Sequence, residues 1–176
     1  KLDYLVAGIG TGGTLSGAAK YLKEKNPKIK IIAVDPIGSV FYHYFKTGKL
    51  SQPHVYKVEG IGEDMLTGAM DFSVVDEIYQ VNDQQSFLMA RMLTRQEGLF
   101  VGGSSGSAAY VALELAKKVG KDKIIVVILP DSGTRYLSKI YSDEWMKDNS
   151  FLLEEKAPTQ IGKIKDVIKI QKRLIT

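Results

Sequence analysis

The glycine-rich stretch GIGTGGTLSG, residues 8–17, contains the residue types and spacing that most directly suggest chemistry. Three of its glycines match the G-x-G-x-x-G pattern of dinucleotide binding. Thr11 and Thr14 add hydroxyl donors to a run of backbone N–H groups before a predicted helix. That combination suits the several oxygens of one terminal phosphate. A tight turn without a ligand is a third interpretation, although so many glycines cost stability without function.

The elements around this stretch predict a βαβ unit. Residues 2–9 are an apolar run typical of a buried strand, and residues 29–35 predict a second strand. Between them, helical spacing of apolar residues begins at Thr14 and ends before Asn26. The two strands are therefore expected to pair in parallel. Asp35 ends the second strand where a ribose-binding acid belongs in dinucleotide enzymes, so that interpretation stays open.

The rest of the chain continues the alternation of helices and strands. Further elements are predicted over residues 40–45 (helix), 74–81 (strand), 84–96 (helix), 108–118 (helix) and 123–129 (strand). A second glycine-rich turn, residues 102–107, precedes one of these helices, and its serines suit either an anion site or N-caps. The pattern predicts an α/β fold with three layers, αβα, and a mostly parallel sheet. We expect Met65 and Met70 to fill the core, and Trp145 to anchor the end segment.

Composition limits the classes of function. Hydrophobic residues at 44% and charged residues at 25% are typical of a soluble globular protein, and we expect it to be cytoplasmic and not in a membrane. The absence of cysteine excludes disulfides and a cysteine nucleophile. The net charge of +4 is concentrated in residues 163–176, so it gives no argument for nucleic acid as a partner. His43 and His54 lie in no metal-ligand spacing, and we expect no metal site.

Several short motifs occur in a defined order: GTGGT (10–14), VDP (34–36), VEGIG (58–62), QEG (96–98), GGSSGS (102–107) and PDS (130–132). Over residues 1–155 the chain resembles the C-terminal half of fold-type II pyridoxal-phosphate enzymes of the β-replacement group. The segment SDEWM, residues 142–146, resembles the cystathionine β-synthases within that group. The resemblance implies part of their catalytic large domain over residues 1–148. It also implies a linker and the start of a regulatory module over residues 149–176.

The resemblance implies pyridoxal 5′-phosphate as cofactor and assigns residues to it. The residues implied for cofactor binding are Gly10, Thr11, Gly12, Gly13 and Thr14 around the phosphate and Ser104 at the ring nitrogen. The substrate-site candidates are Gly60, Gly62, Glu63 and Asp131. A neutral hydroxyl at the ring nitrogen leaves that nitrogen largely unprotonated, which suits loss of a β-substituent better than a long-lived carbanion. The Glu63 carboxylate would either orient the ammonium group of the second substrate or face solvent.

The reaction implied is that of a carbon–oxygen lyase: serine, or an activated serine, condenses with homocysteine to give cystathionine. Two alternatives remain, a cysteine synthase that uses O-acetylserine and sulfide, and an NAD(P)-binding Rossmann domain. In the family, the lysine that forms the Schiff base lies N-terminal to the matched stretch. We therefore expect this chain to be part of a larger domain and inactive alone, with a homodimer or higher homo-oligomer in the full-length protein.

Overall fold

A four-stranded parallel sheet forms the centre of the computed structural model, which describes residues 1–153. The strands are β1 (Tyr4–Gly8), β2 (Lys30–Pro36), β3 (Glu77–Val81) and β4 (Ile125–Val127), in the spatial order β3-β2-β1-β4. All three pairings are parallel, and Ala7 of β1 lies opposite Ala33 of β2. The predicted linker and module start, residues 149–176, fall mostly outside the described residues.

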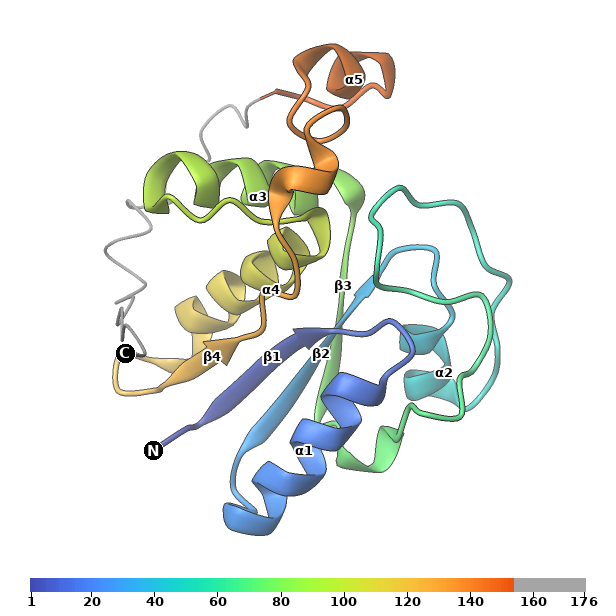
Figure 1. The fold of residues 1–176 in the computed structure, drawn as a ribbon. Coiled ribbons are helices and arrows are strands. Elements are labelled where there is room, and N and C mark those ends of the chain that lie inside the picture. Colours follow the sequence, from blue (N-terminus) through green and yellow to red (C-terminus); the bar gives the residue numbers. More distant parts are fainter. Residues whose placement is uncertain (154–176) are drawn as a thin grey trace.

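Helices cover both faces of this sheet, as Figure 1 shows. Helices α1 (Gly13–Lys25) and α2 (Phe41–Thr47) lie on one face, and α3 (Asp83–Glu97) and α4 (Gly103–Val119) lie on the other. Side chains alternate along β1 accordingly: Leu5 and Ala7 join the core under α1, whereas Val6 packs with residues of α4. The central strands β1 and β2 are buried on both faces, which is the reason they read in the sequence as short apolar runs. The predicted three-layer α/β fold is confirmed.

The chain path places a switch point between β1 and β4. From β1 the chain passes through α1 to β2 and on to β3, always moving away from β1 in one direction. It then returns through α3 and α4 to β4, which pairs with the other side of β1. Because the two crossovers lie on opposite faces, a crevice opens at the carboxyl ends of β1 and β4. Ligands of open α/β sheets bind in such crevices.

Helix α4 begins earlier than the sequence predicted. Residues 103–107 were expected to be a glycine-rich turn, but they form the first turns of the helix. Gly106 explains the difference, because a methyl group there would overlap the backbone oxygen of Ser86 and lie 2.8 Å from the Ala90 nitrogen on α3. The glycine thus permits close helix packing and does not break the helix. The hydroxyl of Ser107 also donates to Ser86 Oγ at 2.7 Å.

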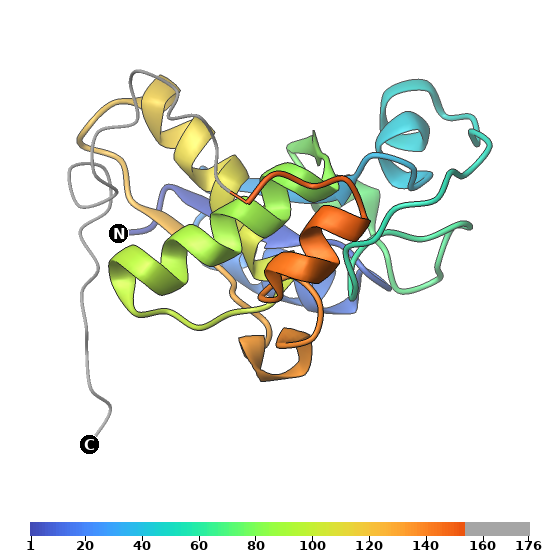
Figure 2. The same ribbon diagram turned by 90° about the horizontal axis from the view of Figure 1, so that it is seen from above.

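A smaller cluster joins the end of the described chain to α3. Helix α5 (Asp143–Asp148) lies beside α3 in Figure 2, and the Trp145 ring stands 5.8 Å from Phe87 and 5.9 Å from Phe151. Trp145 therefore anchors this segment as predicted. The other short elements are the 3₁₀ turns η1 (Phe72–Val74) and η2 (Gly133–Tyr136). Within the described residues, no helix combines the length and apolar character that crossing a membrane requires.

The long connection between α2 and η1 contains one wrong prediction. Met70 is buried, but Met65 is 67% exposed and does not fill the core. Residues 49–71 form neither helix nor strand, so no periodicity distinguishes an inward from an outward methionine there.

Candidate active site

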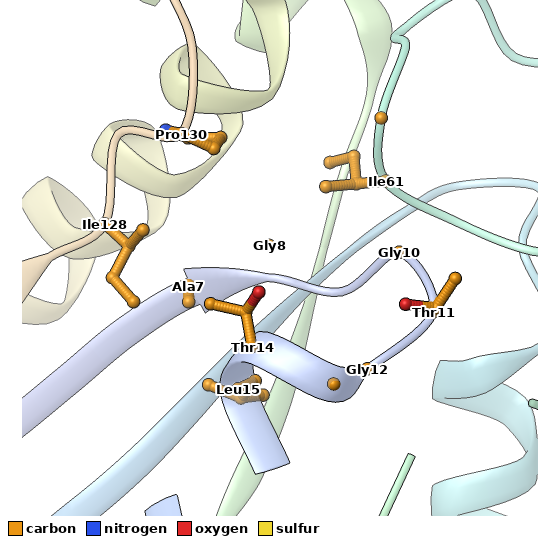
Figure 3. A pocket seen from close by; sticks show the side chains of 12 residues that line it. Ala7, Gly8, Gly10, Thr11, Gly12, Thr14, Leu15, Ile61, Ile128 and Pro130 are labelled. Atoms are coloured by element: carbon orange, nitrogen blue, oxygen red, sulfur yellow. The ribbon is translucent and has the colours of Figure 1, made fainter. Parts of the chain in front are cut away.

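A pocket of about 160 Å³ lies at the carboxyl ends of β1 and β4, at the switch point of the sheet. Its lining consists of Ala7, Gly8, Gly10, Thr11, Gly12, Gly13, Thr14, Leu15, Gly60, Ile61, Ile128 and Pro130. Figure 3 shows the glycine loop with Thr11 and Thr14 on one side, and Ile61 and Pro130 across from it. No ionisable side chain belongs to this lining, so backbone dipoles and hydroxyl groups set its electrostatics.

The N-terminus of α1 forms the polar wall of the pocket. Gly12 is the N-cap residue, with a φ of 88°, and no side chain caps the helix there. The first turn also contains no acidic residue. The first N–H groups of a helix have no partner within it, and the helix dipole makes this end positive. Together with the hydroxyl of Thr14, this wall is suited to a phosphate dianion.

The conformation of the glycine loop depends on close contacts with residues 60–70. A methyl group at Gly10 would lie 2.8 Å from the Gly60 carbonyl oxygen, and one at Gly12 would lie 2.7 Å from the Met70 backbone. The hydroxyl of Thr67 donates to the Thr11 carbonyl oxygen at 2.7 Å. The loop is thus fixed from outside, which leaves its own N–H groups available to a ligand.

The segment Gly60–Gly62 connects this loop to the start of α4. Gly60 and Gly62 both have positive φ angles, and the Gly62 N–H donates to the Ile9 carbonyl at 2.6 Å. A methyl group at Gly60 would lie 3.9 Å from Ser104 Oγ. Ser104 lies in the first turn of α4, is 3% exposed, and follows a glycine N-cap without a side-chain cap. The structure therefore brings the glycine loop, Gly60 and Ser104 together.

Asp131 lies beside the same end of α4. Its carbonyl accepts from Gly102 N at 3.2 Å, and its Oδ2 accepts from the Tyr136 hydroxyl at 2.6 Å. Burial, then this hydrogen bond, raises the pKa of Tyr136 above its ordinary value. The other carboxylate oxygen, Oδ1, is buried with no hydrogen-bond partner among the described residues. Asp131 thus supports the α4 N-terminus from the loop after β4.

Glu63 and Gly62 lie next to the pocket but do not line it. The Glu63 backbone is held on both sides: its N–H donates to Ser39 Oγ at 3.1 Å, and its carbonyl accepts from Val40 N at 3.1 Å. Its side chain is partly exposed. The structure therefore places the substrate-site candidates around the pocket, with Gly60 alone among them in its wall.

Asp35 is 0% exposed and faces the protein interior. Its Oδ2 accepts from Tyr42 N at 2.9 Å at the start of α2. Burial raises the pKa of Asp35 to about 6, against hydrogen bonds from Ser39 and Tyr42 that lower it. A carboxylate this deeply buried is not available to a ribose, which argues against the dinucleotide interpretation.

Some residues of the pocket were missed from the sequence. Ile128 and Pro130 line it because β4 pairs with β1, a contact between distant parts of the chain. Thr67 fixes the glycine loop from a segment with no recognisable motif. The one available signal was the position of Pro130 just after a predicted parallel strand, where ligands gather.

Comparison with known proteins places the chain in a family. Residues 1–131 match the family model described as pyridoxal-phosphate dependent enzyme, so the chain belongs to the pyridoxal-phosphate dependent enzymes. It is 50% identical over 155 residues to a cystathionine beta-synthase of Mus musculus, covering 88% of this chain and 28% of that protein. It is 48% identical over 152 residues to a cystathionine beta-synthase of Apis mellifera, covering 86% and 30%.

A bacterial relative is also similar. The O-acetylserine dependent cystathionine beta-synthase of Bacillus subtilis (strain 168) is 46% identical over 134 residues, covering 76% of this chain and 41% of that protein. The chain thus spans between about a quarter and two fifths of the length of these three relatives.

The pocket fits the phosphate of the family's cofactor. An uncapped helix N-terminus, two lining threonines and the absence of a lining carboxylate are all favourable to a dianion. The side chain that Gly10 lacks leaves room for the Gly60 backbone, which closes the pocket from the opposite side.

Proposed function

We propose that the full-length protein condenses serine, or an activated serine, with homocysteine to form cystathionine by pyridoxal-phosphate dependent β-replacement. The observation that carries this proposal is the 46–50% identity with relatives that bear the name cystathionine beta-synthase, over stretches of the chain at least 134 residues long. The geometry adds support, because the pocket unites the glycine loop with the wall formed by Gly60, Ile61 and Pro130.

The N-terminus of α1 would bind the phosphate of the cofactor. The backbone N–H groups of residues 10–14 and the hydroxyls of Thr11 and Thr14 would bind the terminal phosphate of the cofactor. Their partial positive charge at the helix end compensates the dianion without a lysine or arginine in the lining. Ile61, Ile128 and Pro130 exclude water from this end of the site, which strengthens those electrostatic contacts.

Ser104 would donate a hydrogen bond to the ring nitrogen of the cofactor. When bound, the cofactor withdraws electrons from Cα of the amino-acid substrate, and a neutral partner limits how far it does so. A hydroxyl in a buried first turn therefore favours departure of the β-substituent over reactions at Cα alone. The position of Ser104 next to Gly60 supports this role.

The substrate side of the site would include Gly60, Gly62, Glu63 and Asp131. The two glycines allow the backbone to approach the amino-acid substrate closely. Glu63 stands next to them with a partly exposed carboxylate, which can orient the ammonium group of the second substrate.

The full-length protein is needed for catalysis under this proposal. Residues 1–148 form the C-terminal part of the catalytic domain, residues 149–176 are a linker and the start of a regulatory module, and the functional unit is a cytoplasmic homo-oligomer. The pocket lining contains no lysine that could form a Schiff base with the cofactor. Adding pyridoxal phosphate to the chain 1–176 should therefore produce no visible band of a lysine-bound cofactor.

A substrate comparison on the full-length enzyme tests the activity. Serine and O-acetylserine are each paired with homocysteine and with sulfide, and cystathionine and cysteine are measured by mass spectrometry. We expect cystathionine from homocysteine with at least one of the two donors. Cysteine from sulfide without any cystathionine would overturn the proposal in favour of a cysteine synthase.

A further inference from the structure

The buried pair Asp35 and Ser39 connects β2 to the substrate side of the pocket. Asp35 is 0% exposed and Ser39 is 4% exposed. Neither belongs to the pocket lining, so neither has a role in the site as proposed above. Both are polar groups whose burial is costly unless they are hydrogen-bonded.

The hydrogen bonds of Ser39 give its hydroxyl a direction. Its Oγ accepts from Glu63 N at 3.1 Å and from Phe41 N at 3.5 Å. A hydroxyl that accepts two N–H groups still has its own proton to donate. The nearby Asp35 carboxyl is sensitive to this hydroxyl, which lowers the pKa of Asp35 against the effect of burial.

The segment whose Glu63 N–H donates to Ser39 is held at three points. Ser39 binds the Glu63 N–H, Val40 N binds the Glu63 carbonyl at 3.1 Å, and the Ile9 carbonyl binds the Gly62 N–H at 2.6 Å. Gly60, two residues earlier, lies in the pocket wall and faces Ser104. Without Ser39, the left-handed conformations of Gly60 and Gly62 lose one of the contacts that select them.

We propose that Asp35 and Ser39 are positioning residues that fix the segment Gly60–Glu63 for the second substrate. Ser39 acts through its hydroxyl, and Asp35 acts through the start of α2, where the neighbouring Val40 N–H binds the Glu63 carbonyl. Asp35 accepts a hydrogen bond from Tyr42 N, so it fixes the start of α2 relative to this segment. Which substrate is affected rests on the proposed function, but the positioning itself does not.

Hydrogen exchange on the full-length enzyme tests the positioning without reference to activity. Ser39→Ala should accelerate exchange at the amides of residues 60–64 by about tenfold, because one of their hydrogen bonds is lost. Ser73→Ala is the matched control: Ser73 is another serine with a hydrogen-bonded hydroxyl, which donates to Asp71 Oδ1 at 2.6 Å, but it lies in η1 outside the pocket lining. Asp35→Asn should give the same pattern as Ser39→Ala with a smaller acceleration.

Kinetics on the same variants test the consequence for the reaction. In Ser39→Ala we expect KM for homocysteine to rise about tenfold with kcat changed less than about threefold, as for an interaction that binds substrate and transition state equally. Unchanged exchange at residues 60–64 in both Ser39→Ala and Asp35→Asn would overturn the positioning. So would equal acceleration in Ser73→Ala. Failure of the unmodified enzyme to make cystathionine would overturn the proposed function alone, since the exchange result stands without it.

Discussion

Helices α1 and α4 begin in similar sequences but use their glycines differently. Both have a glycine N-cap, no side-chain cap and no acidic residue in the first turn. At α1 the N-cap Gly12 is left-handed, with φ 88°, and shapes a loop that turns its N–H groups to the pocket. At α4 the N-cap Gly102 is extended, with φ −78°, and Gly106 lies inside the helix against α3. Similar composition therefore shapes the proposed phosphate loop in one region and permits helix packing in the other.

The largest expected effect is the loss of stability on substitution of Gly106, which packs against α3. In Gly106→Ala the new methyl group would overlap the Ser86 carbonyl oxygen on α3, so the two helices must move apart. We expect the free energy of unfolding of the full-length enzyme to fall by about 3 kcal/mol. Denaturant titration measures it. The control is Gly17→Ala in α1, which has no atom within 4 Å of the new methyl and should stabilise by roughly 0.5–1 kcal/mol. Equal effects of the two changes would contradict the packing role.

Substitution of Gly12, in the proposed phosphate loop, should weaken cofactor binding. Gly12→Ala forces an L-residue into a left-handed conformation and places a methyl 2.7 Å from Met70, so the loop must change shape. We expect the affinity of the full-length apoenzyme for pyridoxal phosphate to fall by roughly 30-fold, which corresponds to about 2 kcal/mol. Fluorescence titration measures it. Gly48→Ala, at φ 70° with no neighbour within 4 Å, carries the backbone strain alone and should leave this affinity unchanged.

Helix α2 adds a third case, because Asp35 caps it from β2. Burial raises the pKa of Asp35 from 3.8 to about 6, so the folded protein binds this proton more tightly than the unfolded chain. The stability from this group is complete below about pH 4 and is lost as pH rises through about 6. Asparagine does not titrate. The free energy of unfolding of Asp35→Asn, taken relative to that of the unmodified enzyme, should therefore rise by about 1.4 kcal/mol between pH 5 and pH 7.5.

Denaturant titrations at both pH values give that difference. A constant difference between the two proteins would mean that Asp35 does not titrate in this range.

The smallest effect is expected for a hydroxyl in the α1 loop. Thr14→Val keeps the shape of the side chain but removes the hydroxyl proposed to donate to the phosphate. We expect roughly fivefold weaker binding of pyridoxal phosphate to the full-length apoenzyme, about 1 kcal/mol, with unchanged stability. Thr14→Ser retains the hydroxyl and should bind normally. If valine binds as well as serine, the backbone N–H groups alone hold the phosphate.

The first half of the fold was accessible from local patterns. Residues 2–9, the helix from Thr14 and residues 29–35 correspond to β1, α1 and β2, because apolar period and the breaker at Asn26-Pro27 act locally. The start of α4 could not be predicted from local patterns, because glycine and serine residues favour turns unless a partner helix requires their small size. Only the position of α3 supplies that requirement.

The site was accessible in part for the same reason. Its glycine loop is contiguous in sequence, and its fold context follows from the βαβ pattern. The opposite wall, formed by Ile128 and Pro130, depends on β4 pairing with β1. The burial of Asp35 depends on α2 packing over the end of β2. Neither contact has a local signature.

The strand order has a consequence for how the protein folds. Strands β1, β2 and β3 pair with neighbours along the chain. Tyr4 of β1 pairs instead with Ile125 of β4, from which it is separated in sequence by all the other strands and by α3 and α4. Contacts of such long sequence separation carry the largest loop-closure cost and form slowly. We therefore expect the β1–β4 ladder to close late, so that the last wall of the pocket is built only when the rest of the sheet is in place.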